Sequence, residues 1–108
     1  MRRLNLIALL ATAGFALPAW AGCTLPPAPT KVPNGVQATE PEMIAAMQTL
    51  KRYNSDVNNY VKCLEFEANQ NRLSRDEQAR KHNGAIEGLQ IIAGKFNEQV
   101  RLFKSKSS

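Results

Sequence analysis

The sequence is poor in the residues that usually build catalytic centres and membrane spans. Its 108 residues include one His, one Trp and two Cys, and aromatic residues make up only 6%. No C-x-x-C pair, phosphate-binding Gly-rich loop or Ser-His-Asp order is apparent. The length excludes two large domains and a large enzyme with a deep cleft, and the composition excludes a conventional polytopic membrane protein. We therefore expect a protein that is not an enzyme and has no cofactor.

The first 21 residues have the three parts of a secretory signal peptide. Arg2 and Arg3 form a positively charged start, and residues 4–17 form an apolar stretch that is short for a membrane span. Ala19 and Ala21 place small side chains at positions −3 and −1 from the expected cleavage site, where signal peptidase requires them. We expect cleavage after Ala21 and export to the Gram-negative periplasm. Removing 21 of 108 residues leaves 87, and losing two Arg lowers the formal charge from +5 to +3.

Both cysteines, Cys23 and Cys63, lie in the part expected to be exported. An even pair in an exported chain predicts a disulfide, and only one intramolecular pairing exists. A disulfide that closes a loop of about 40 residues restricts the unfolded chain. In the chain-entropy model this stabilises the fold by about 3–4 kcal/mol. Trp20-Ala21-Gly22 before Cys23 is also a degenerate lipobox. Lipidation of Cys23, an intermolecular disulfide and free thiols therefore stay as alternatives.

Three segments follow the predicted signal peptide. Residues 22–38 contain four prolines and a Pro-Asn-Gly turn signal, which predict an extended, Pro-rich arm. Residues 39–70 and 74–104 each begin with a Ser/Thr-x-x-Glu capping box and are predicted to be helical, with a polar break between them. Two long helices joined by a short loop make an antiparallel hairpin. The predicted fold is all-α, with residues 39–104 forming one helical-hairpin domain, and the last residues are expected to be a frayed tail.

An apolar stripe runs along the second predicted helix in strictly alternating steps of three and four residues, as expected for one helix face. With a turn near residues 71 and 72, positions whose numbers sum to about 143 should face each other across the hairpin. The stripe consists of Ala79, His82, Ile86, Leu89, Ala93, Phe96, Val100 and Phe103.

Two surfaces of the hairpin are candidates for docking. The arm is long enough to run back along the first helix to Cys63, and we expect it to cover Tyr53 and Tyr60. Beside the stripe of the second helix, small and branched residues make a shallow face that permits close approach by another backbone. We interpret this face either as covered by the arm or as a dimer or partner surface. It consists of Gly84, Gly88, Ile91 and Ile92.

The remaining residues that could take part in catalysis or metal binding have a simpler structural interpretation. His82, the only His, is expected to form a buried hydrogen bond with Tyr60, although a base-and-phenol pair would use the same two residues. One His without a second ligand at matching spacing is a poor metal site, so we expect no metal. Met43 and Met47 fall on the core stripe of the first helix and are expected to pack there.

Several short motifs resemble those of a family of small exported proteobacterial proteins of unknown function. The resemblance covers most of the chain after residue 21; it implies export and a helical hairpin and assigns no catalytic residue. The motifs are Pro33-Asn34-Gly35, Glu42-Met43, Tyr60-Val61-Lys62-Cys63-Leu64-Glu65, His82-Asn83 and Phe96-Asn97-Glu98-Gln99-Val100-Arg101-Leu102-Phe103.

Together these features predict a small non-catalytic periplasmic protein that acts as a protein-interaction or scaffold module. Its partner would be another envelope protein or a second copy of itself in a homodimer. A charge of +3 is too small to indicate nucleic-acid binding. The basic residues lie near both ends of the hairpin, so weak binding to an anionic membrane surface or envelope polymer is an alternative. A redox or metal-binding accessory protein is a weaker one.

Overall fold

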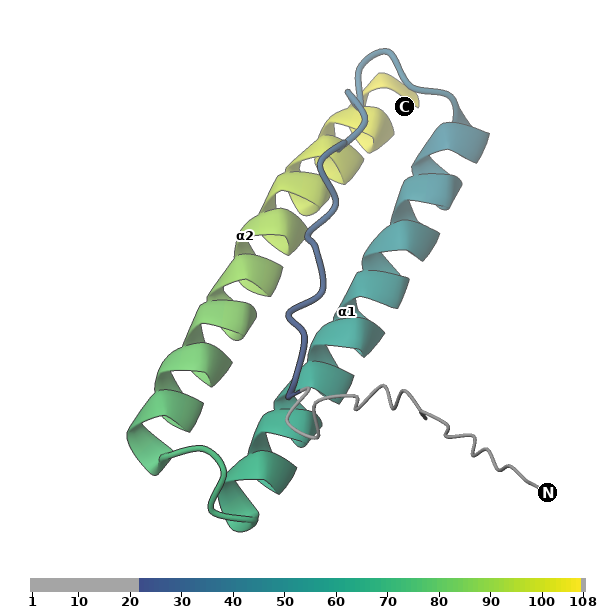
Figure 1. Cartoon of the computed structure of the whole chain (residues 1–108). Helices are drawn as coiled ribbons and strands as arrows, with labels where there is room; N and C mark the ends of the chain where they lie inside the picture. The colour runs from purple at the N-terminus through teal and green to yellow at the C-terminus, as the bar shows by residue number, and fades with distance from the viewer. Residues whose placement is uncertain (1–21, 108) are drawn as a thin grey trace, which may run out of the picture.

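The fold is an antiparallel hairpin of two long helices with an extended arm laid along it. The computed structural model describes residues 22–107, so the predicted signal peptide lies outside the described residues. Helix α1 spans Glu40–Asn69 and helix α2 spans Arg75–Ser107. The arm, residues 22–39, runs back between the two helices along one face of the hairpin (Figure 1). The prediction of an all-α helical hairpin is confirmed.

Local capping explains where both helices begin. Thr39 Oγ1 accepts a hydrogen bond from the Glu42 backbone N–H at 3.3 Å, and the Thr39 N–H donates to Glu42 Oε1 at 2.8 Å. Ser74 Oγ accepts from the Glu77 N–H at 3.1 Å. These contacts satisfy backbone donors that have no partner within the first helical turn. The polar side chains therefore define the two helix starts that the sequence pattern predicts.

The end of α1 is closed by a Schellman motif. Asn71 has a φ of 61°, a left-handed conformation that Asn tolerates better than most residues. Its N–H donates to the Ala68 carbonyl at 3.0 Å, and the Arg72 N–H donates to the Glu67 carbonyl at 2.9 Å. The chain can then reverse within a few residues and enter α2.

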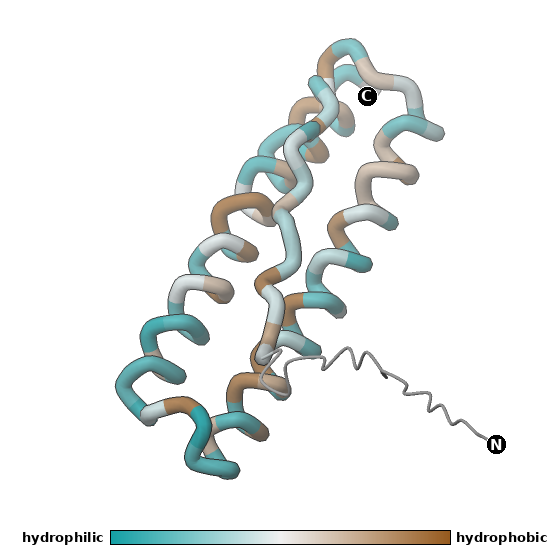
Figure 2. Tube along the Cα trace, in the orientation of Figure 1, coloured by the Kyte–Doolittle hydropathy of each residue, from teal (hydrophilic) through white to brown (hydrophobic). Residues whose placement is uncertain are grey.

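The core is formed by three partners, because the arm packs against both helices. Its larger cluster contains Tyr53, Val57, Tyr60 and Leu64 of α1 with Ala85 and Ile92 of α2. Cys23 and Val32 of the arm pack against this cluster, and Val57 is completely inaccessible to solvent. A smaller cluster at the open end joins Ala38, Met43 and Phe96. Apolar segments recur along both helices and parts of the arm, whereas the hairpin loop is largely hydrophilic (Figure 2).

The buried face of α2 differs from the predicted stripe. Ala79 is exposed and His82 is only half-buried, whereas Ala85 and Ile92, which lie beside the stripe, are in the core. The prediction was wrong at these positions because it considered only contacts between two helices. The arm adds a third partner on one side of the hairpin and moves the buried face of α2 toward that side.

The C-terminal end of α2 is also longer and better anchored than expected. The helix continues to Ser107, three residues beyond the predicted boundary. Lys106 Nζ donates hydrogen bonds to the carbonyls of Val36 at 3.0 Å and Ala38 at 2.6 Å, and it lies 4.9 Å from the ring centre of Phe103. These contacts tie the predicted frayed tail to the arm. Between residues 22 and 107, neither helix has a stretch long and apolar enough for a membrane crossing.

Candidate functional site

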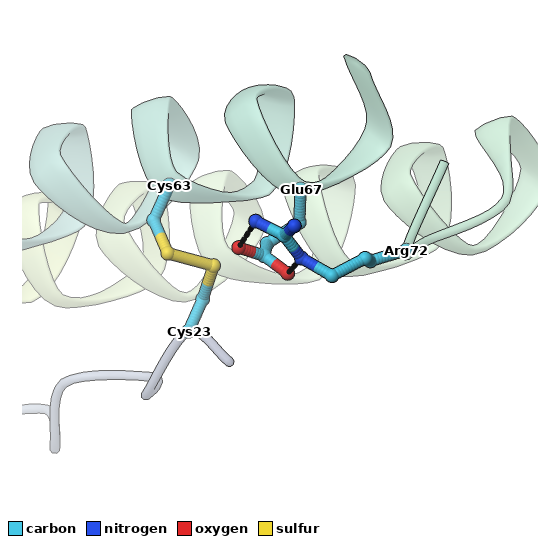
Figure 3. The surroundings of a disulfide bond; sticks show 4 residues. All are labelled: Cys23, Cys63, Glu67 and Arg72. Carbon is cyan, nitrogen blue, oxygen red and sulfur yellow. Dashed lines mark hydrogen bonds and ion pairs between the residues drawn. A yellow bond between two sulfur atoms is a disulfide. The ribbon is translucent and has the colours of Figure 1, made fainter. Parts of the chain in front are cut away.

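A disulfide fastens the beginning of the arm to α1. Cys23 and Cys63 are bonded, with their Cα atoms 5.7 Å apart (Figure 3). This is the pairing expected from the two-cysteine count. Because the Cys23 sulfur is used in this bond, it cannot also carry a thioether-linked lipid in this state. The disulfide and lipidation of Cys23 are therefore mutually exclusive.

Hydrogen bonds and a close backbone approach fasten the other end of the arm. The Gly35 N–H donates to Gln99 Oε1 of α2 at 2.7 Å, and the Asn34 carbonyl accepts from the N–H groups of Gln37 and Ala38. A Cβ added to Gly35 would lie 2.0 Å from the Gln99 carbonyl oxygen. Only Gly fits this contact, so the Pro-Asn-Gly motif serves for docking on α2 as well as for turning the chain.

Tyr53 and Tyr60, the two residues expected to dock the arm, both lie in the larger core cluster. Their exposed fractions are 6% and 7%. Val32 and Cys23 of the arm pack against the same cluster. The two tyrosines therefore lie where the arm, α1 and α2 meet, and the large rings fill space that two helices alone would leave open.

An ion pair lies beside the disulfide at the loop end of the hairpin. Arg72 donates two hydrogen bonds to the Glu67 carboxylate, at 2.8 and 3.0 Å (Figure 3). These hydrogen bonds lower the pKa of Glu67 below its usual value, and they raise the pKa of Arg72. The Arg72 guanidinium also lies 5.6 Å from the ring centre of the exposed Phe66. The pair connects the last turn of α1 to the loop.

We expect Arg72→Met to raise the pKa of Glu67 toward that of an ordinary carboxyl group. The pKa of Glu98, which is lowered by hydrogen bonds from Arg101, provides the matched control and should not move. Because folding lowers the pKa of Glu67, its contribution to stability is present above the unfolded-state pKa and is lost as pH falls through the folded-state pKa. Carboxyl-selective NMR titration of the original protein and the variant measures both groups directly. An unchanged Glu67 pKa in Arg72→Met would contradict the assignment.

The candidate interaction surface on α2 does not exist as one continuous face. Ile92 is 9% exposed and packs in the core, and a Cβ on Gly88 would lie 3.4 Å from the Tyr53 hydroxyl. Gly84 has open space around it, and Ile91 is 54% exposed. The arm therefore separates the four residues into two that face the core and two that face solvent. The interpretation that the arm covers this face holds for Ile92, which lies beside Val32.

An apolar groove that the sequence pattern does not reveal lies between the helices at the open end of the hairpin. It has a volume of about 210 Å³, and no residue of the arm lines it. Ile44 and Met47 on its α1 wall are 44% and 39% exposed. Glu40 and Lys104 stand on opposite walls. The other lining residues are Met43, Phe96, Val100 and Phe103.

His82 does not form the expected hydrogen bond with Tyr60. Its Nδ1 lies 3.3 Å from Oδ1 of the neighbouring Asn83, on an exposed part of α2. The buried face of α2 is displaced toward the arm, so His82 lies at the edge of the interface between the two helices. This explains why the expected hydrogen bond with Tyr60 does not form. Over residues 22–107, no three His, Cys, Asp or Glu side chains gather in a way that could hold a metal ion.

Comparison with known proteins identifies no relative. The chain matches no protein-family model, and neither a curated protein nor a solved structure is significantly similar to it. Its function must therefore be inferred from the sequence and the geometry of the hairpin.

Proposed function

We propose that this protein is a small, non-catalytic interaction module of the bacterial periplasm. Its N-terminal sequence has the parts of an export signal, and the Cys23–Cys63 bond is of the kind that persists in oxidising compartments. The disulfide, the Gly35 contact and the Lys106 contacts hold the arm on one side of the hairpin. A pre-formed, rigid hairpin of this kind loses little conformational entropy when it binds a partner.

The observation that carries the proposal is the uncovered groove at the open end. Its walls are built from Met, Ile, Val and Phe side chains, and Met and aromatic residues are enriched at the centres of protein interfaces. Ile44 and Met47 remain substantially exposed to water, although both lie beside the core residues Met43 and Phe96. Covering such a patch removes apolar surface from water at roughly 25 cal/mol per Å². A protein partner with an apolar face would supply that cover.

A photo-crosslinking residue placed at Met47 in living cells tests the proposal. We expect a covalent adduct between this position and a protein, because the side chain lies at the groove. The matched control is Ile91, which is equally apolar and 54% exposed, but lies outside the groove. Adduct formation at position 47 and none at position 91 would support an interaction surface at the groove. Equal labelling at both positions, or no labelling at either, would refute it.

A further inference from the structure

We propose that the occupant of the groove is a second copy of this chain, bound in a two-fold dimer in which both hairpins point in the same direction. The proposal rests on the interaction function proposed above and names its partner. It concerns the face of the hairpin opposite to the arm, where the groove continues into a longer apolar surface.

The apolar surface extends along α2 from the groove toward the loop. Ala93, Leu89 and Ile86 follow Val100 in steps of seven, four and three residues, so they lie on the same side of the helix. All four are only half-buried within one chain. This is the regularly spaced stripe found in the sequence, and the arm has turned it partly away from α1. The stripe has coiled-coil-like spacing, and a single hairpin covers it only in part. Such a stripe is suited to pack against further helices.

The outline of this face is large enough for a stable dimer. Helix α1 has 30 residues, which corresponds to about 45 Å at 1.5 Å per residue. Two helices side by side, each about 10 Å across, give a face of roughly 900 Å². A typical stable interface buries about 800 Å² on each partner. Two hairpins joined through this face would form a four-helix bundle.

The distribution of apolar residues favours the parallel arrangement. When two hairpins meet face to face with a two-fold axis along their length, α1 of one copy lies beside α2 of the other at the same height. Ile44 and Met47 then meet Val100 and Phe103 of the second copy. In the antiparallel arrangement α1 lies beside α1, so Ile44 and Met47 would be separated from Val100 and Phe103 of the second copy.

Charge complementarity favours the same arrangement. Glu40 and Lys104 are exposed on opposite walls of the groove, and neither takes part in an ion pair with any residue between 22 and 107. Because α1 of one copy lies beside α2 of the other in the parallel dimer, Glu40 would pair with Lys104 of the second copy. The two-fold axis repeats this contact, so the interface would contain two such pairs.

Sedimentation equilibrium of the purified, disulfide-bonded protein tests the dimer. We expect a particle of twice the chain mass, and we expect Met47→Glu to weaken association roughly 30-fold or more, because the interface would bury a carboxylate without a partner in the groove. Ile91→Glu, which adds the same charge outside the groove, should leave association unchanged. Circular dichroism of both variants would show that the helices persist. A monomer at all concentrations, or a dimer that Met47→Glu leaves intact, would overturn the proposal.

A charge exchange between two variants tests the orientation. Glu40→Lys and Lys104→Glu should each weaken self-association by about tenfold, because like charges then meet twice in the interface. An equimolar mixture of the two variants should associate about as well as the original protein, because positions 40 and 104 again carry opposite charges at both contacts of the mixed dimer. Failure of the mixture to recover would overturn the parallel arrangement. A cross-link from position 47 to a different protein would overturn the second copy as occupant while leaving the proposed interaction function intact.

Discussion

Replacing Cys23 and Cys63 together by Ser is expected to lower the free energy of unfolding by about 3–4 kcal/mol and the Tm by roughly 15–25 °C. The bond closes a loop with a sequence separation of 40 residues. Without it, the unfolded chain regains conformational freedom, and the folded arm loses its attachment to α1. Urea unfolding followed by circular dichroism, together with a thermal scan, gives both quantities.

The original protein with its disulfide reduced is the matched comparison for this variant. It should have the same stability as the double Ser variant, since both lack only the cross-link. A double variant within about 0.5 kcal/mol of the oxidised protein would show that hydrogen bonds and packing hold the arm by themselves. That result would contradict a stabilising role for the disulfide.

Gly35→Ala is expected to destabilise the protein by about 2–3 kcal/mol, the usual cost of forcing an extra group into a filled space. The added Cβ would lie 2.0 Å from the Gln99 carbonyl oxygen and 3.1 Å from the Phe103 backbone nitrogen. Both atoms belong to the backbone of α2, which cannot move aside as a flexible side chain could. The arm must therefore lift from the helix and lose the hydrogen bond to Gln99. Chemical denaturation measures the loss.

Gly84→Ala is the control for this experiment. Gly84 lies within α2, and a Cβ added there would meet open space instead of another part of the fold. Ala is favoured over Gly in a helix by up to about 1 kcal/mol, so this variant should be slightly more stable than the original protein. The same chemical change is thus expected to have opposite signs at the two positions. A neutral Gly35→Ala variant would show that the arm does not need its close approach to α2.

Features that depend on neighbouring residues could be predicted from the sequence. The starts of α1 and α2 follow from Thr39 and Ser74, because capping contacts reach only three residues along the chain. The disulfide follows from the number of cysteines, since two allow a single intramolecular pairing. The hairpin follows from two periodic segments joined by a short polar break.

Features that depend on the arm could not be predicted in the same way. The arm has no periodic pattern that would show which side of the hairpin it covers, and its side changes which residues of α2 are buried. Ala79 and Ala85 have the same side chain, yet one is exposed and the other is in the core. The contact of Gly35 with Gln99 and that of Lys106 with the arm join residues more than 60 positions apart. No residue of the arm lines the groove at the open end, so whether this groove is covered also depends on which side the arm takes.

The arm also determines the order in which the protein can fold. Contacts between α1 and α2 near the loop join residues close in sequence, and helical hairpins with such local contacts fold in microseconds to milliseconds. The cross-link and the hydrogen bonds that join the arm to the helices have long sequence separations: 40 residues for the disulfide, 64 for Gly35 with Gln99 and 70 for Lys106 with Val36. Disulfide formation takes seconds to hours. A newly made chain therefore passes through a stage in which the hairpin exists and Tyr53 and Tyr60 are still uncovered, and closure of the arm completes folding.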